Sequence, residues 1–496
     1  MKKNYLITYL LLTMTSGVLA QSVKYAVELG GGVPTESPAH QQPFWLRANQ
    51  YGTVPLTGTF GTLRLGISRD YAPRSDTVAA HRKKMDWGFG LYAVGNTRPN
   101  VASYPYRVLL PDAFVKVRYR WLELFGGNRR EVYGQGDTLL TSGFVSWSGN
   151  APVFPKIQLH TPDYVPLGGF LKKAVAFRAG YAHGWLANTY IQGSYLHQKY
   201  VAVRFGKPQA KIKAIFGLNH QVQWGGRADY LVGTDLSVDG NLPTAFRDYL
   251  SLVTGRYPDD LQNSRYTVYD GTNRIGNHVG HYDLAVEWQR PGSYWSLYHQ
   301  HYFEDASGLA LINAPDGLTG LRFRNDQTRP VWFRLNRAVL EWLSTMSQSG
   351  SIFDINARYQ GADNYFNNSQ YREGWSYRGY GIGTPLAMPR LGLSDTVNTI
   401  NSGGYFLDNR IKMGHVAFIG TFRHGPTVTL RATYSQHYGT YTRQFDSPFG
   451  QFSGLLSAQW QLSKWPGTTL TTSFAVDRGS FIQPATGSFI SLKKVW

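Results

Sequence analysis

The sequence predicts an all-β fold, namely a transmembrane antiparallel β-barrel of about 18 strands with a short helical segment in a long loop. Three observations predict it. Aromatic residues make up 15% of the chain and charged residues only 16%, well below the ~25% charge of soluble globular chains. Apolar and polar residues alternate in short segments along nearly the whole chain. The mean hydropathy of −0.32 is too polar for a helical membrane protein.

The first 20 residues are expected to be an export signal. Lys2 and Lys3 form a basic start, residues 5–14 are apolar, and 18–20 end in Ala20, so cleavage is predicted before Gln21. The apolar core is too short to span a bilayer, and no later stretch approaches ~18 apolar residues. We therefore expect residues 21–496 to form one exported domain that crosses a membrane only as a closed sheet.

Alternating segments supply the strands. They are 62–68, 87–93, 115–121, 175–181, 282–288, 353–359, 428–434, 456–462 and 470–476. In 115–121, for example, Tyr119 and Trp121 share a face opposite Arg118 and Arg120. Aromatic residues at the ends of the apolar rows are typical of the girdles of lipid-facing strands. A soluble sandwich also alternates, but the number of segments and the export signal favour an outer-membrane barrel.

The last residues form a further strand. Ile490, Leu492 and Trp496 share a face, and the chain ends in this aromatic residue. The pattern resembles the C-terminal signal that the barrel-assembly machinery recognises during outer-membrane insertion. At roughly 25 residues per strand and loop, the chain without its signal allows about 16 to 20 strands, and an even number favours 18.

Three segments do not follow the strand pattern. They are 146–173, 233–280 and 361–412. Within the second, residues 243–254 predict a short amphipathic helix, because Pro243 suits a first turn and Gly255 a C-terminal stop. We expect this helix to plug the lumen or cap one end, or else to be one turn in a surface loop. Residues 361–412 predict long extracellular loops.

No catalytic motif is present. The chain has no Cys, which excludes disulfides, Cys–zinc sites and Cys nucleophiles, and it lacks the His-Glu-x-x-His, Gly-x-Ser-x-Gly and P-loop patterns. His299 and His301 share a strand face, but zinc needs further ligands, and Tyr298 and Tyr302 opposite favour a polar aromatic lining. We expect a protein without cofactor or metal that is not an enzyme, although distant strands can assemble catalytic groups.

The predicted inner faces are basic, and the net charge of the whole chain is +19. Their basic residues are Arg64, Lys116, Arg118, Arg120, Arg178, Arg204, Arg337, Arg358 and Arg431, against the acids Asp283, Glu287, Glu341 and Asp354. A basic wall concentrates anions, Arg offers a planar fork for carboxylates, and Tyr or Trp rings suit sugars. These features favour an acidic polysaccharide. Alternatively the charges pair with the acids or with lipopolysaccharide phosphates and keep a water-filled lumen. Nucleic acid is not expected for an exported barrel.

One region resembles a known family. The runs 195–206 (YLHQKYVAVRFG) and 217–226 (GLNHQVQWGG) look like the central signature of Wzi-type capsule-assembly outer-membrane proteins, in the form of Bacteroidetes-like sequences. Residues 159–164 and 43–46 resemble flanking motifs. The resemblance implies an outer-membrane barrel of about 18 strands that acts as a lectin and anchors exported polysaccharide. Enterobacterial members carry an N-terminal helical bundle, whereas residues 25–29 here look strand-like.

Together these features predict a monomeric outer-membrane barrel that binds exported capsular or exopolysaccharide, with outer-membrane lipid and lipopolysaccharide as its surroundings. A general porin with a basic lumen is the alternative. The predicted charge contacts are Arg118, Arg120, Arg178 and Arg358, and the signature contacts are His197, Lys199, His220, Gln223 and Trp224.

The signature also has a purely structural interpretation. Residues 224–226 fit a strand that ends at the girdle and turns. His197 and Lys199 fall in phase with outward apolar residues, so they lie beyond the lipid band or follow a bulge.

Overall fold

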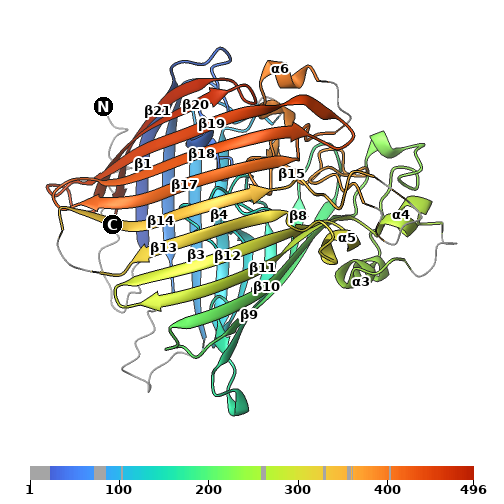
Figure 1. Ribbon diagram of the computed structural model, residues 1–496, viewed down its shortest axis with the longest axis horizontal. Helices are drawn as coiled ribbons and strands as arrows, with labels where there is room; N and C mark the ends of the chain where they lie inside the picture. The colour runs from blue at the N-terminus through green and yellow to red at the C-terminus, as the bar shows by residue number, and fades with distance from the viewer. Residues whose placement is uncertain are drawn as a thin grey trace, which may run out of the picture.

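The computed structural model describes residues 23–71, 85–101, 104–258, 264–327, 331–352, 354, 359, 361–400 and 404–496. Its main sheet has 19 strands, all of whose pairings are antiparallel. Eighteen of them close into a barrel (Figure 1), and the two-residue β7 is a side addition to β8. The predicted fold class and strand number are confirmed.

The strands of the main sheet are β1 (Lys24–Pro34), β2 (Phe60–Arg69), β3 (Met85–Asn96), β4 (Val108–Tyr119), β5 (Leu122–Asn128), β6 (Lys156–His160), β7 (Val165–Pro166), β8 (Val175–Leu186), β9 (Ser194–Phe205), β10 (Ile212–Trp224), β11 (Asn277–Arg290), β12 (Ser293–Phe303), β13 (Gly317–Asn325), β14 (Phe333–Ser344), β17 (Ile411–Phe422), β18 (Thr427–Gly439), β19 (Gln444–Gln461), β20 (Thr468–Gly479) and β21 (Ala485–Val495).

The remaining elements lie in the loops. They are a small hairpin of β15 (Ser376–Tyr377) and β16 (Tyr380–Gly381), the helices α2 (Phe44–Arg47), α3 (Phe246–Thr254), α4 (Val268–Asn273), α5 (Ala306–Leu309) and α6 (Asp395–Asn398), and the 3₁₀ turns η2 (Gly169–Leu171), η3 (Asp229–Leu231) and η4 (Arg390–Gly392). Among the described residues, no helix is long and apolar enough to cross a lipid bilayer.

The first and last strands close the barrel. β1 pairs with both β2 and β21, and its Leu29 lies opposite Leu492. Both ends of the described chain lie at one end of the barrel, together with short connections such as 291–292 and 423–426; we call this the turn end. The opposite end carries the long connections 35–59, 129–155, 225–276 and 345–410, and we call it the loop end. Outer-membrane barrels place short turns on the periplasmic side and longer loops outside.

The outer wall carries exposed apolar side chains, as the alternation predicts. Leu284 and Val286 on β11 are 48% and 49% exposed, whereas Ala285 between them is 6% exposed and faces the lumen. Leu63, Leu65, Phe474 and Ile490 are exposed in the same way. The pattern follows from the two-residue period of a strand, which sends successive side chains to opposite faces. The outer wall is therefore the surface that suits lipid.

One predicted strand is shorter in the structure. The segment 115–121 was expected to be a strand throughout, but β4 ends at Tyr119. Arg120 has a positive φ of 56° and forms the tight turn to β5 with Trp121, because the two strands pair directly from Tyr119 to Leu122. The predicted strand 353–359 falls largely outside the described residues.

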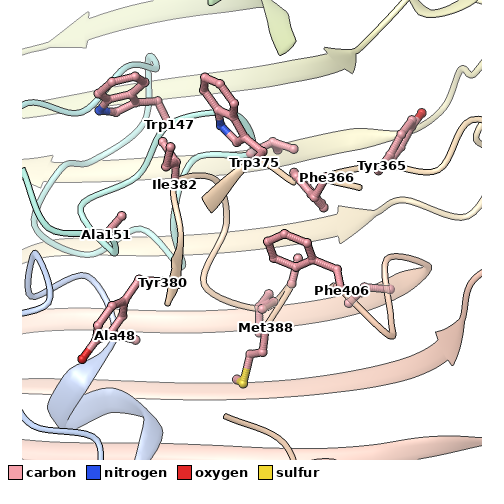
Figure 2. Close-up of a cluster of buried hydrophobic side chains, with 14 of the residues drawn as sticks. Ala48, Trp147, Ala151, Tyr365, Phe366, Trp375, Tyr380, Ile382, Met388 and Phe406 are labelled. Atoms are coloured by element: carbon pink, nitrogen blue, oxygen red, sulfur yellow. The ribbon is translucent and has the colours of Figure 1, made fainter. Parts of the chain in front are cut away.

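Three loops from the loop end fold into the lumen. Described residues of 35–59, 129–155 and 361–410 form one buried apolar cluster with inward strand residues, and we call these loops the plug. Trp147, Trp375, Phe366 and Phe406 are 8% exposed or less, and Figure 2 shows how side chains from the separate loops pack together. Residues 361–412 were expected to be extracellular loops, but most of their apolar side chains are buried here instead.

Polar contacts fix the plug to the inner wall. The Phe44 amide donates to Asp477 Oδ2 at 2.7 Å on β20, and Trp45 Nε1 donates to Thr433 Oγ1 at 3.1 Å on β18. From the second loop, the Val145 amide donates to Gln300 Oε1 at 2.6 Å on β12. Contacts on strands around the barrel hold the plug at the loop end of the lumen.

The predicted helix in 243–254 exists as α3, Phe246–Thr254, but it does not enter the lumen. Leu252 packs against Val222 and Trp224, which point outward from β10. The Tyr249 hydroxyl lies 2.6 Å from that of Tyr181, which is also on the outer wall. α3, α4 and α5 gather beside the loop-end tips of β8–β11 (Figure 1). The segment therefore covers part of the outer wall, because its apolar face matches outward rings there.

Candidate functional site

The predicted charge contacts do not meet at one place. The Arg118 guanidinium on β4 lies 4.1 Å from the ring centre of Tyr71, and that of Arg178 on β8 lies 5.6 Å from that of Tyr200. Arg120 is exposed at the turn end, where its guanidinium lies over Tyr119. Arg358 lies outside the described residues. The predicted set is therefore spread over the inner wall and the turn end.

Several other cations of the inner wall pair with acids or carbonyl groups of the protein itself. Arg64 pairs with Glu28 at 3.5 Å, and Arg322 and Arg337 both pair with the fully buried plug carboxylate of Asp137, at 3.1 and 3.0 Å. Arg431 donates to the plug carbonyls of Leu139, Leu140 and Thr141. These guanidiniums fix the plug or neutralise acids, which is the alternative that the sequence left open.

The signature residues lie mainly on the outer wall. His197, Lys199, His220 and Trp224 alternate with inward residues on β9 and β10, and both strands keep a continuous register without a bulge. They therefore lie at the loop-end edge of the apolar band, under α3. Gln223 is the exception, because it faces inward and its Nε2 donates to Tyr190 Oη at 3.2 Å.

These outward polar groups bind the covering segment. The Tyr249 hydroxyl lies 3.2 Å from His197 Nδ1, and Lys199 Nζ donates to the carbonyl of Val253 near the end of α3. His220 Nε2 lies 2.9 Å from His278 Nδ1, and His278 Nε2 lies 2.9 Å from the carbonyl of Ile275. The signature thus anchors a loop to the barrel wall.

The end of the signature is a turn. β10 stops at Trp224, and Gly225 and Gly226 follow with φ of 67° and 105°. Residues that carry a side chain rarely adopt this left-handed backbone conformation, so glycine suits both positions. The turn directs the chain away from the wall into the 225–276 loop.

A cluster that the sequence did not indicate lies at the loop end. We call Tyr104, Tyr190, Tyr230, Arg372 and Glu373 the rim cluster. The Arg372 guanidinium is exposed and lies 4.8 Å from the ring centre of Tyr230 and 5.6 Å from that of Tyr190. Among the described residues, Arg372 makes no ion pair within 4 Å. Its cation is therefore held on two aromatic rings and faces solvent.

Glu373 completes the rim cluster. The Tyr104 hydroxyl lies 2.9 and 2.8 Å from its two carboxylate oxygens. Burial raises the pKa of Glu373 above its ordinary value, against the opposing effects of the Tyr104 hydroxyl and the Arg372 charge. The predicted residue Gln223 reaches this cluster from below through Tyr190. The cluster thus combines a free cation, ring faces and a carboxyl group.

Two similar pairs lie at the same end. The Arg378 guanidinium lies 5.2 Å from the ring centre of Tyr106 and 5.3 Å from that of Tyr377, and that of Arg410 lies 4.1 Å from that of Tyr441. A guanidinium over an aromatic face is stabilised by the ring quadrupole, and its edge stays able to bind carboxylates. The Tyr- and Arg-rich composition of 361–412 was the available signal, but of these rings Tyr106 and Tyr441 come from other loops, whereas Tyr377 lies in the same segment.

A cavity of about 900 Å³ lies below the plug. Its ceiling includes Trp45, Asn49 and Tyr51, and its wall is a row of hydroxyl and amide side chains on β18–β21. These are Thr427, Thr429, Ser457, Gln459, Gln461, Thr469, Thr471, Ser473 and Ser491. The lumen on this side is polar and roomy rather than filled.

Metal-ligating side chains do not converge in the part of the chain that the structure describes: no group of three or more His, Asp or Glu is placed to hold an ion. His299 Nδ1 lies 2.8 Å from Thr319 Oγ1, and His301 Nε2 lies 3.2 Å from the carbonyl of Gly308. Both face outward, opposite the inward Tyr298 and Tyr302.

Comparison with known proteins supports the fold. The chain is similar to Wzi of Escherichia coli, described as an outer-membrane protein involved in group 1 capsule assembly and a carbohydrate-binding β-barrel, with 13% identity, a TM-score of 0.54, and coverage of 94% of this chain and 83% of that one. Pseudomonas aeruginosa OccD3 (OpdP) has 10% identity, a TM-score of 0.45, and coverage of 96% and 91%. No family model matches the sequence. No curated protein matches it either. The chain thus has a Wzi-like outer-membrane barrel fold.

Proposed function

We propose that this protein binds an acidic capsular or exopolysaccharide at its loop end and helps to hold it at the cell surface. The observation that carries the proposal is the rim cluster, in which the exposed Arg372 guanidinium lies on Tyr190 and Tyr230. A planar guanidinium binds a sugar carboxylate through two hydrogen bonds. The ring faces beside it offer apolar surface for the sugar ring.

Three further facts support this proposal. The plug fills the loop end of the lumen, which suits a binding protein better than an open channel. The similar fold of the Escherichia coli protein is described as carbohydrate-binding. The signature at 195–206 and 217–226 gives the same family resemblance from sequence. On this proposal the signal at residues 1–20 exports the chain, and the loop end faces outward.

Binding of polygalacturonate, an acidic polysaccharide probe, to the purified protein in nanodiscs tests the proposal. We expect Arg372→Ala to weaken binding about tenfold, the equivalent of roughly 1.4 kcal/mol, and Arg372→Lys to restore only part, because Lys lacks the planar fork. Arg423→Ala, an exposed Arg at the turn end, is the matched control and should bind as wild type. Neutral dextran should bind no variant.

Equal binding of polygalacturonate by the wild type, the Arg372→Ala protein and the Arg423→Ala protein would remove the rim cluster from the proposal. No binding by the wild type would contradict the lectin function itself.

One observation favours the alternative, a general porin. The polar cavity below the plug is large enough for solutes. Single-channel conductance in a planar bilayer separates the two functions. A large, steady conductance that acidic polysaccharide leaves unchanged would support the porin, whereas a closed barrel that retains the polysaccharide supports the lectin.

A further inference from the structure

The 225–276 loop, which connects β10 and β11, lies against the outer wall of the barrel rather than above it. Leu252 of α3 is 1% exposed and packs there against Val222 and Trp224 of β10. Tyr249 contacts both His197 on β9 and Tyr181 on β8. Tyr181 is itself 43% exposed on the outer wall. α3 therefore borders directly on the apolar band of β8–β11.

The exposed face of α3 has an apolar flank and a polar flank. At about 100° per residue, Val253, Phe246 and Leu250 follow Tyr249 around the helix, and Ser251 and Arg247 lie on the opposite flank next to Asp248. Phe246 is 76% and Leu250 52% exposed. Asp248 is buried and pairs with Arg265 at 3.2 Å, within the loop itself. The apolar flank thus lies on the side of Tyr181, and the polar flank on the side of the loop.

Rings and cations around the helix match a membrane interface. His183 is surrounded by Trp185, Tyr195 and Trp224, with ring-centre distances of 5.0, 5.3 and 6.2 Å. Trp and Tyr concentrate at the headgroup level of membranes. Arg247 and Arg256 are exposed at the two ends of α3, where long side chains reach headgroups.

We propose that α3 is a membrane-contacting foot: its Phe246–Leu250 flank inserts into the lipid leaflet at the loop end of the barrel. The molecule that this flank contacts is membrane lipid, at the boundary between acyl chains and headgroups. Lipid is the expected contact because the exposed apolar flank of α3 is continuous with the exposed apolar band of the barrel wall. Contact between α3 and lipid is a role separate from polysaccharide binding. It requires that the barrel lies in an outer membrane.

The outward signature residues then have a defined task. An outward His or Lys within the lipid band would be costly, but His197 and Lys199 are covered by α3 and bonded to Tyr249 and Val253. They hold the foot at the level where lipid begins. Loss of these bonds would free the foot from the wall.

The absence of Cys from the chain makes the test direct. Single Cys residues replace Phe246 or Leu250 and carry a nitroxide label, in vesicles of phosphatidylethanolamine and phosphatidylglycerol. The accessibility of each label to oxygen, which is enriched in lipid, is compared with its accessibility to a water-soluble nickel chelate. Leu284→Cys is the lipid reference, Asp235→Cys the solvent reference, and Ser251→Cys the matched control on the polar flank.

We expect the oxygen-to-nickel ratio at positions 246 and 250 to approach that at 284 and to exceed that at 251 several-fold. Ratios at 246 and 250 equal to those at 251 and 235 would overturn the proposal. A second measurement does not depend on labels: trypsin should spare Arg247 and Arg256 in vesicles, cleave them after Leu250→Asp, and still spare them after Ser251→Asp. Cleavage of the wild-type foot in vesicles would also overturn it. Failure of polysaccharide binding would leave both results unaffected.

Discussion

Single buried carboxylates position the plug. Glu341 on β14 is 1% exposed, and its Oε1 accepts from Tyr298 at 2.5 Å while its Oε2 accepts from the amide and hydroxyl of Ser142, each at 2.6 Å. One side chain therefore joins two strands to the plug. The cost of burying this carboxylate is compensated because both of its oxygens accept hydrogen bonds. From sequence it was only one of a few acids on a predicted inner face, since Ser142 lies 199 residues away.

Removal of this carboxylate should loosen the plug locally. Glu341→Ala leaves three buried donors unsatisfied, at a cost of about 2–5 kcal/mol. We expect hydrogen exchange at the Ser142 and Val145 amides to become faster. Glu287→Ala is the matched control, because Glu287 accepts from Tyr294 and does not contact the plug cluster. Unchanged exchange at Ser142 would show that the apolar cluster alone fixes this loop.

A second buried acid, Asp363, predicts that the loop end is sensitive to pH. Burial, followed by the nearby charge of Asp305, raises the pKa of Asp363 to about 7. The hydroxyls of Ser307 and Ser349 donate to it. Because the ordinary pKa is 3.8, the folded chain keeps a proton that the unfolded chain has lost. This contribution to stability is fully present below about pH 4 and is lost as the pH rises through about 7.

We therefore expect the contact of Ser307 with Ser349 and Asp363 to weaken as the pH rises from about 5 to 8. Exchange of the Ser307 and Gly308 amides, followed by mass spectrometry, should show it. Asp363→Asn should remove most of this pH dependence. Asp326→Asn at the turn end should not, and a pH dependence that survives Asp363→Asn would assign the effect to another group.

At the scale of elements, the strands were predictable and the paths of the loops were not. Alternation is a local property, so Leu284, Val286 and their neighbours indicated strand and face directly. A loop carries no such period. The helix at 246–254 was recognisable from Pro243 and Gly255, but its position outside the wall depends on contacts with Tyr181 and Trp224, which come from distant strands.

The candidate site was predicted only in part. The type of residue was foreseen, because Arg and Tyr do meet at the loop end, but the predicted members were mostly elsewhere. Of the predicted contacts that the structure describes, Gln223 alone reaches the rim cluster. Arg372 was not singled out because its two rings, Tyr190 and Tyr230, lie in other loops. Arg120 was misplaced because a tight turn interrupts the alternation.

At the scale of the whole molecule, we expect the plug to determine whether the barrel conducts ions. We expect the wild-type protein to show only small conductance in a planar bilayer. Replacement of 138–147 by a short Gly-Ser linker removes the hydrogen bonds that Ser142 and Val145 make with the wall. This variant should conduct several-fold more. A matched replacement in the turn 462–467 should leave conductance unchanged, and a wild type as conductive as the linker variant would contradict a closed lumen.

The plug also sets an order of events during folding. Phe44 binds Asp477 across a sequence separation of 433 residues, and Trp45 binds Thr433 across 388. These partners exist only after β18 and β20 have formed, so the first loop is the earliest part of the plug to be made and among the last to dock. Contacts of such separation form late because closing a long stretch of chain costs entropy. Until β18 and β20 have formed, the first loop therefore has no wall to dock on, and the interior beside it stays open to water.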